Sequence, residues 1–296
     1  MKPYHFMDHE TLEREYSPSS CIDDIMVFIN QYIDKSAEAR ELLNGQFEQN
    51  VKYGPEERSH FDIFMPDKAK KAANDPEIAP LPVHVFIHGG YWQELSKNES
   101  CFMAPNFLDH DVIFIALDYT LAPDATMHEI VDQTRRGMIS VINNARKFGG
   151  DPENITISGS SAGGHLVAEV LSTDWNLYGF NKCPLKGALA ISGVFDLEPI
   201  VNTYVNDPLK MTKEDATSLS PLHHIPDECC DIVFSVGENE TSEFHRQTDE
   251  YMKACQKKGI NTSYVKMPKF NHFDIVMELN KKDSPLFKAV LNQIRS

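Results

Sequence analysis

The sequence predicts an α/β fold in which helices flank a mostly parallel, doubly wound sheet. Short apolar runs alternate with helix-like segments along most of the 296 residues. Most of these runs lack a polar residue at every second position, which is typical of strands buried on both faces. A third observation is a glycine-rich turn between a strand and a helix at 154–166, "NITISGSSAGGHL". Together these observations place reactive residues on loops at the carboxyl ends of the strands.

The spacing of apolar residues along the chain predicts the individual helices and strands. Apolar residues at helical spacing predict an early helix within 22–43. The alternating run 60–66 is expected to be a strand, and the charged, Ala- and Pro-rich stretch 67–82 a solvated loop. Further strands are expected at 83–90, 111–119, 154–160, 187–195, 231–239 and 262–268. The helices between and after them are expected at 128–147, from 162 onward, at 243–257 and at 284–294.

The sequence contains no internal repeat, low-complexity tract or linker, so we expect residues 1–296 to form a single domain. Residues 1–50 are expected to be a helical N-terminal segment. Residues 196–230 lack clean periodicity and are expected to form a small excursion that walls a pocket over the active site.

Composition excludes several classes of partner. The formal net charge of −16 argues against nucleic acid and against an anionic membrane surface, since both require clustered Lys and Arg. No apolar run reaches the roughly 18 residues of a membrane span, and the N-terminus lacks the apolar core of a signal peptide. The six scattered cysteines include no C-x-x-C pair. We therefore expect reduced thiols, a cytoplasmic location and no metal site.

The turn at 154–166 contains three serines, Ser158, Ser160 and Ser161. Only Ser161 has glycines at both −2 and +2, Gly159 and Gly163, which gives the G-x-S-x-G pattern. A nucleophile elbow needs this spacing because a side chain at either flank would collide with the neighbouring strand or helix. The pattern predicts that Ser161 is the nucleophile of an α/β-hydrolase fold.

A serine nucleophile needs a base and an acid that orients the base. On the α/β-hydrolase fold the acid follows the serine in the chain, and the histidine base follows the acid. His272 stands just past the last predicted strand and is the expected base. The acid should follow the strand at 231–239, where Glu238, Glu240 and Glu243 are the candidates. Glu240 lies in the middle of the loop, whereas Glu243 fits the first turn of the next helix. Periodicity leaves the choice open.

The oxyanion hole is expected at "HGG", which ends the strand at 83–90. The backbone N–H groups of Gly89 and Gly90 can approach a substrate oxygen closely because neither residue has a Cβ. The N–H of Ala162, directly after the nucleophile, is the further expected donor. His88 is expected to hold this loop by hydrogen bonds rather than to transfer protons.

Aromatic residues near the predicted strand ends permit an aryl-binding pocket. Tyr91, Trp92 and Phe273 are the candidates. Aromatic side chains at such positions are more often part of the core, so the pattern alone does not establish the pocket.

With these residues placed, the sequence resembles arylformamidases, also called kynurenine formamidases, of the α/β-hydrolase superfamily. The resemblance is carried by "LEREYSPS", "HGGYWQ", "VDQTRRG", "STDW", "SGVFDLEPIV", "EFHRQ" and "HFDIV". It implies hydrolysis of N-formyl-L-kynurenine to kynurenine and formate without a metal or other cofactor. It also implies that Ser161 and His272 are nucleophile and base, and that Glu240 is the acid, at a position where the vertebrate-type pattern has Asp.

Two other functions fit the same residues. One is a broader carboxylesterase that acts on short-chain aryl esters, and the other is a non-catalytic scaffold of the same fold that binds a ligand. The expected partner is thus a small aryl formamide or ester. The sequence leaves the oligomeric state open, with a homodimer among the states considered.

Overall fold

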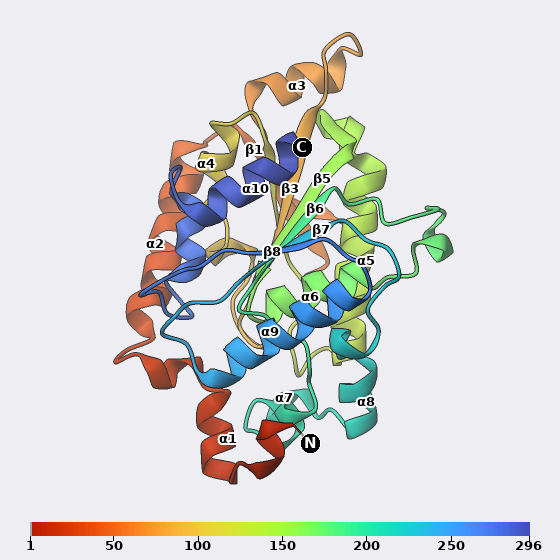
Figure 1. Cartoon of the computed structure of the whole chain (residues 1–296). Helices are drawn as coiled ribbons and strands as arrows, with labels where there is room; N and C mark the ends of the chain where they lie inside the picture. Colours follow the sequence, from red (N-terminus) through yellow and green to blue (C-terminus); the bar gives the residue numbers. More distant parts are fainter. Residues whose placement is uncertain (1) are drawn as a thin grey trace.

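The computed structural model, which describes residues 2–296, contains one eight-stranded sheet with the order β1-β2-β4-β3-β5-β6-β7-β8 (Figure 1). The strands β1 and β2 are antiparallel to their neighbours, and every pair from β4 to β8 is parallel. This confirms the predicted class, a mostly parallel sheet. The strands are β1 (Phe47–Lys52), β2 (His60–Phe64), β3 (Leu81–Ile87), β4 (Ile113–Leu117), β5 (Gly150–Ser160), β6 (Gly187–Ile191), β7 (Asp231–Ser235) and β8 (Thr262–Tyr264).

Helices cover both faces of the sheet (Figure 1). The helices α5, α6 and α9 share one hydrophobic cluster with the sheet, and α2, α4 and α10 share the other. The α-helices are α1 (His9–Glu15), α2 (Met26–Leu42), α3 (Asp67–Asn74), α4 (Ala104–Leu108), α5 (Met127–Asn144), α6 (Ala162–Leu171), α7 (Asn206–Leu209), α8 (Lys213–Ser218), α9 (Ser242–Lys257) and α10 (Pro285–Arg295).

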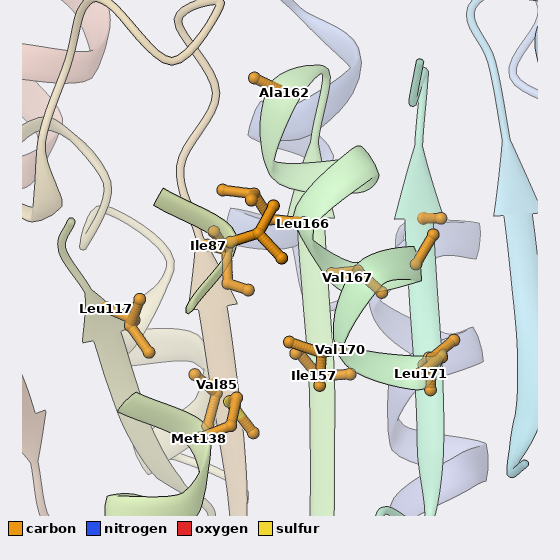
Figure 2. Packing of buried hydrophobic residues seen from close by; sticks show 14 of the residues in the cluster. Val85, Ile87, Leu117, Met138, Ile157, Ala162, Leu166, Val167, Val170 and Leu171 are labelled. Atoms are coloured by element: carbon orange, nitrogen blue, oxygen red, sulfur yellow. The ribbon is translucent and has the colours of Figure 1, made fainter. Parts of the chain in front are cut away.

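The central strands are mostly apolar because each of their faces meets a helix layer. In β4, Ile113, Ile115 and Leu117 point into the cluster with α5 and α6, whereas Phe114 and Ala116 point into the opposite one. Figure 2 shows side chains from β3, β4 and β5 packed with the apolar face of α6. This packing fixes α6 on the sheet and thereby fixes the residue that joins β5 to α6.

Three sequence expectations differ from the structure. The stretch 67–82 is not all loop, since α3 occupies Asp67–Asn74. Its Lys and Ala residues favour helix, although Ala69 is the only buried residue of α3. The N-terminal segment is helical only as far as Leu42, because Phe47–Lys52 forms β1 at the edge of the sheet. The strand expected at 154–160 begins earlier, since β5 also includes residues 150–153.

The excursion 196–230 is built of short helical segments, among them α7 and α8. Figure 1 shows α1, α7 and α8 gathered at one end of the molecule. The N-terminal segment contacts the excursion by polar groups, since the Tyr204 backbone N–H donates to Glu13 and the Ser17 hydroxyl donates to the Tyr204 hydroxyl. None of the described helices is long and apolar enough to cross a membrane.

Candidate active site

Ser161 lies between the end of β5 and the start of α6, in a strained backbone conformation. Its φ is 58° and its ψ is −121°, a region that non-glycine residues rarely adopt and that persists only where surrounding structure enforces it. The Ser161 N–H donates to the Ile191 carbonyl at 2.9 Å, and the His165 N–H donates to the Ser161 carbonyl at 3.1 Å. The elbow is therefore tied to β6 on one side and to the first turn of α6 on the other.

The two flanking glycines are required by close backbone contacts. A Cβ at Gly159 would lie 2.3 Å from the Gly163 carbonyl oxygen, and a Cβ at Gly163 would lie 2.1 Å from the Ile87 carbonyl oxygen. No side-chain rotation relieves such contacts, because the atoms belong to the backbone of the turn and of β3. The spacing that singled out Ser161 in the sequence thus has a steric cause.

His272 and Glu240 form a buried pair. The His272 Nδ1 lies 2.6 Å from the Glu240 Oε2, and the exposed fractions of the two side chains are 6% and 1%. The other carboxylate oxygen, Oε1, accepts hydrogen bonds from the Ser192 hydroxyl and the Gly237 N–H, each at 2.6 Å. An ionised carboxylate only accepts, so the His272 Nδ1 carries a proton and its Nε2 is left to act as a base.

The two other glutamates considered from the sequence lie elsewhere. The Glu243 carboxylate accepts hydrogen bonds from the Tyr16 hydroxyl at 2.6 Å and from the Arg246 guanidinium at 2.7 and 2.8 Å. The Glu238 carboxylate accepts from the Lys269 N–H at 2.8 Å. Neither forms a hydrogen bond with His272, which Glu240 contacts.

Ser161 and His272 line the same cavity, which has a volume of about 220 Å³. Within residues 2–296, the Ser161 hydroxyl and the His272 Nε2 have no hydrogen-bond partner, with each other or with any other residue. Nucleophile and base are commonly apart in ligand-free enzymes and close only around the substrate. The His272 ring is held by Phe244 and Phe273, whose ring centroids lie 4.6 and 5.4 Å away.

The loop that follows β3 presents unused backbone donors to this cavity. Gly89 and Gly90 line it, and their N–H groups donate to no other residue in the described part of the chain. The Ala162 N–H at the start of α6 is likewise unpaired within this range. The loop is strained, with φ values of 94° at Gly90, 48° at Tyr91 and 59° at Trp92. Strain of this kind is typical of preorganised sites.

A polar cluster behind this loop contains His88, the residue expected from the sequence to hold the loop by hydrogen bonds, and two partners that were not predicted, Asp118 and Arg58. The His88 ring lies 2.9 Å by Nδ1 from the Gly89 carbonyl and 3.2 Å by Nε2 from the Asp118 carboxylate. Arg58 donates to Asp118 at 2.6 Å and to the Leu95 carbonyl at 2.8 Å. Burial opposes ionisation of Asp118, but hydrogen bonds from His88 and Arg58 hold its pKa below the ordinary value. The sequence feature that could have indicated this cluster is Asp118, a charged residue near the end of the apolar run 111–119.

The aromatic candidates divide between cavity and core. Tyr91 and Phe273 line the cavity. Trp92 does not, because its ring is fully buried and packs edge-on against His165 at 5.0 Å; the structure corrects this assignment. Aromatic lining residues that were not among the sequence candidates are Tyr32, Phe86, Phe102 and Tyr204.

Comparison with known proteins places this site within a family. The BD-FAE family model matches residues 61–255. The chain is 35% identical to the kynurenine formamidase of Danio rerio and 35% identical to that of Salmo salar, and each alignment covers 99% of both chains. The kynurenine formamidase of Drosophila melanogaster is 27% identical over 82% of this chain and 80% of the relative.

Solved structures show the same fold. A Silicibacter protein described as a thioesterase superimposes with a TM-score of 0.81 at 24% identity, covering 95% of this chain and 98% of that one. An esterase of Pyrobaculum calidifontis superimposes with a TM-score of 0.70 at 16% identity, covering 100% and 97%. At these identities the likeness shows the fold alone, which is the predicted α/β-hydrolase fold.

Proposed function

The chain belongs to the kynurenine formamidase family of α/β-hydrolases, and on this premise we propose that it hydrolyses N-formyl-L-kynurenine to kynurenine and formate. The observation that carries the proposal is the single cavity in which an unpaired Ser161 hydroxyl, an oriented His272 and unpaired backbone N–H groups meet. These are the parts that acyl transfer from an amide requires.

In the proposed mechanism, Ser161 attacks the formyl carbonyl while the His272 Nε2 takes its proton. The Glu240 carboxylate stabilises the imidazolium that forms. The developing oxyanion accepts hydrogen bonds from the N–H groups of Gly89, Gly90 and Ala162, which need no reorganisation because they have no other partner. His272 then protonates the departing aniline nitrogen. A water molecule activated by the same ring releases formate from the formyl-enzyme.

The cavity walls support an aryl substrate. Phe86, Phe102 and Phe273 contribute apolar rings, and an aromatic substrate ring gains by stacking or edge-on packing with such rings. The formyl group is the smallest acyl group, so a cavity that also holds an aryl ring needs little further space at the nucleophile.

The proposal is tested with purified protein and Ser161→Ala. This variant should fold normally, by circular dichroism and thermal unfolding, and its kcat/KM for N-formyl-L-kynurenine should fall below about one hundredth of the wild-type value, since the hydroxyl is the bond-forming atom. A folded variant that retains more activity would refute the role of Ser161.

A carboxylesterase for short-chain aryl esters is the second candidate, favoured by the likeness to esterase structures. The kcat/KM for N-formyl-L-kynurenine is compared with that for p-nitrophenyl acetate and p-nitrophenyl butyrate. A formamidase should prefer the formamide and discriminate against butyryl, whereas an esterase should accept both esters better. Failure of a fluorophosphonate to label Ser161 would favour the non-catalytic scaffold.

A cytoplasmic location and a homodimer complete the proposal. All six cysteines are free, which suits a reducing compartment. Light scattering on the purified protein tests the dimer, and fractionation of cells tests the location.

A further inference from the structure

The charged side chains that line the active-site cavity are mainly negative. Two carboxylates, Glu94 and Glu99, belong to its wall. No Lys or Arg among the described residues lines it, and His272 is the only other titratable group of the wall besides tyrosines. A zwitterionic substrate therefore finds anionic partners for an ammonium group and no cationic side chain for a carboxylate.

The two carboxylates are not neutralised by the protein. Within residues 2–296, neither Glu94 nor Glu99 takes part in an ion pair. Glu99 accepts one hydrogen bond, from the Ser96 hydroxyl at 2.6 Å, which leaves most of its lone pairs free.

The cations close by in sequence and space are engaged by other acids. Asp62 forms ion pairs with Arg40, at 2.8 Å, and with Lys97, at 2.9 Å. Arg58 pairs with Asp118 at 2.6 Å. Two buried carboxylates thus pair with the three neighbouring cations, none of which lines the cavity.

Glu94 also lies next to the reacting centre. Its N–H donates to the Gly90 carbonyl at 2.9 Å, and its Cβ lies 3.2 Å from the position that a Cβ on Gly90 would take. The same cavity is lined by the unpaired Ser161 hydroxyl, a residue only 7% exposed. Glu94, Glu99 and Ser161 therefore belong to the wall of one cavity of about 220 Å³.

We propose that Glu94 and Glu99 select aryl formamides whose side chain bears an ammonium group, and that a substrate carboxylate forms no ion pair with the enzyme. The inference rests on the proposed function and specifies its substrate class. An ammonium group gains charge-assisted hydrogen bonds to the two glutamates. A carboxylate at the same place is repelled by both.

Three formamides test the proposal by their kcat/KM values. They are N-formyl-L-kynurenine, its decarboxylated analogue, which keeps only the ammonium group, and its deaminated analogue, which keeps only the carboxylate. The decarboxylated analogue should be hydrolysed at least as efficiently as the parent compound. The deaminated analogue should be at least about tenfold worse, a difference of about 1.4 kcal/mol.

The variants Glu94→Gln, Glu99→Gln and the double variant keep the side-chain shape and remove the charge. The ratio of ammonium-only to carboxylate-only kcat/KM should fall about tenfold in the double variant. Because the ratio is taken within each variant, a general loss of activity cancels. Glu153→Gln is the matched control, since Glu153 is exposed on β5 and is not a cavity residue; its ratio should equal that of the wild type.

The outcomes separate the two levels of the proposal. Hydrolysis of all three formamides at equal kcat/KM, or an unchanged ratio in the double variant, overturns this inference and leaves the formamidase function standing. Hydrolysis of p-nitrophenyl acetate with no turnover of any of the three formamides overturns both.

Discussion

Replacement of Glu240 by Gln tests the acid most directly, because the structure dictates how the amide must lie. The Oε1 position accepts hydrogen bonds from the Ser192 hydroxyl and the Gly237 N–H. In Glu240→Gln the amide oxygen must occupy this position, since an NH₂ group there would oppose the Gly237 N–H donor. The NH₂ group then faces His272 and donates to its Nδ1. The imidazole proton consequently moves to Nε2, which can no longer accept the proton of Ser161.

The expected loss is large. In serine proteases the corresponding acid-to-amide change lowers kcat by about 10⁴ through the wrong His tautomer, which corresponds to about 5 kcal/mol of barrier. The Glu240–His272 distance of 2.6 Å and the two short bonds that anchor Oε1 indicate an equally well-defined geometry. We expect kcat/KM for N-formyl-L-kynurenine to fall by about 10³ to 10⁴, with little change in the far-ultraviolet circular dichroism spectrum.

Glu243→Gln is the matched control, three residues along the chain. It removes the same charge from a buried glutamate, but one that pairs with Arg246 and Tyr16 rather than with His272. Its melting temperature should fall because the buried Arg246 loses a charged partner, while kcat/KM should stay within about tenfold of the wild type. A folded Glu240→Gln protein that keeps more than about a tenth of wild-type activity, or a greater loss in Glu243→Gln, would refute the assignment.

Two further predictions concern stability. Gly163→Ala places a Cβ 2.1 Å from the Ile87 carbonyl oxygen, so β3 and α6 must separate. The free energy of unfolding measured in urea should fall by about 2 kcal/mol or more. A decrease under about 0.5 kcal/mol would contradict the steric account. Burial lowers the pKa of His84 to about 3 from 6.5. Between these pH values the unfolded state binds a proton that the folded state excludes. The free energy of unfolding should therefore decrease as the pH falls from 6.5 toward 3, by up to about 1.4 kcal/mol per pH unit. His84→Gln should flatten this slope in urea titrations between pH 6.5 and 5, and equal slopes in the two proteins would exclude His84 as its source.

Ser161 could be selected from the sequence as the candidate nucleophile because the elbow's steric requirement is local. Gly159, Ser161 and Gly163 are within five positions, and the contacts that forbid side chains at the glycines lie in the turn itself and in the adjacent β3. The strands could be predicted for a related reason. Burial on both faces leaves β4 and β6 without polar side chains and β3 with His84 as its one polar side chain. Such an apolar run is visible without knowledge of its partners.

The acid could not be chosen by the same reasoning. Glu240 differs from Glu243 in its partners, and the Ser192 hydroxyl that orients it is 48 residues away in sequence. Ser192 reaches Glu240 because β6 and β7 are adjacent and in register from Gly187 to Ile191, a fact of sheet order that periodicity does not contain. Trp92 was misplaced for a comparable reason, since its ring packs against His165 on α6, a contact between distant segments that the residue type does not predict.

The electrostatics of the cavity depend still more on distant residues. The net charge of −16 says little by itself, because surface carboxylates are screened over about 10 Å by salt. What matters is that Asp62, on the edge-proximal strand β2, and Asp118, just after β4, bind the cations nearest the cavity. Removing Asp62 would leave Arg40 and Lys97 without their common carboxylate partner. The charge preference of the site is therefore set jointly by its own glutamates and by carboxylates that the substrate never contacts.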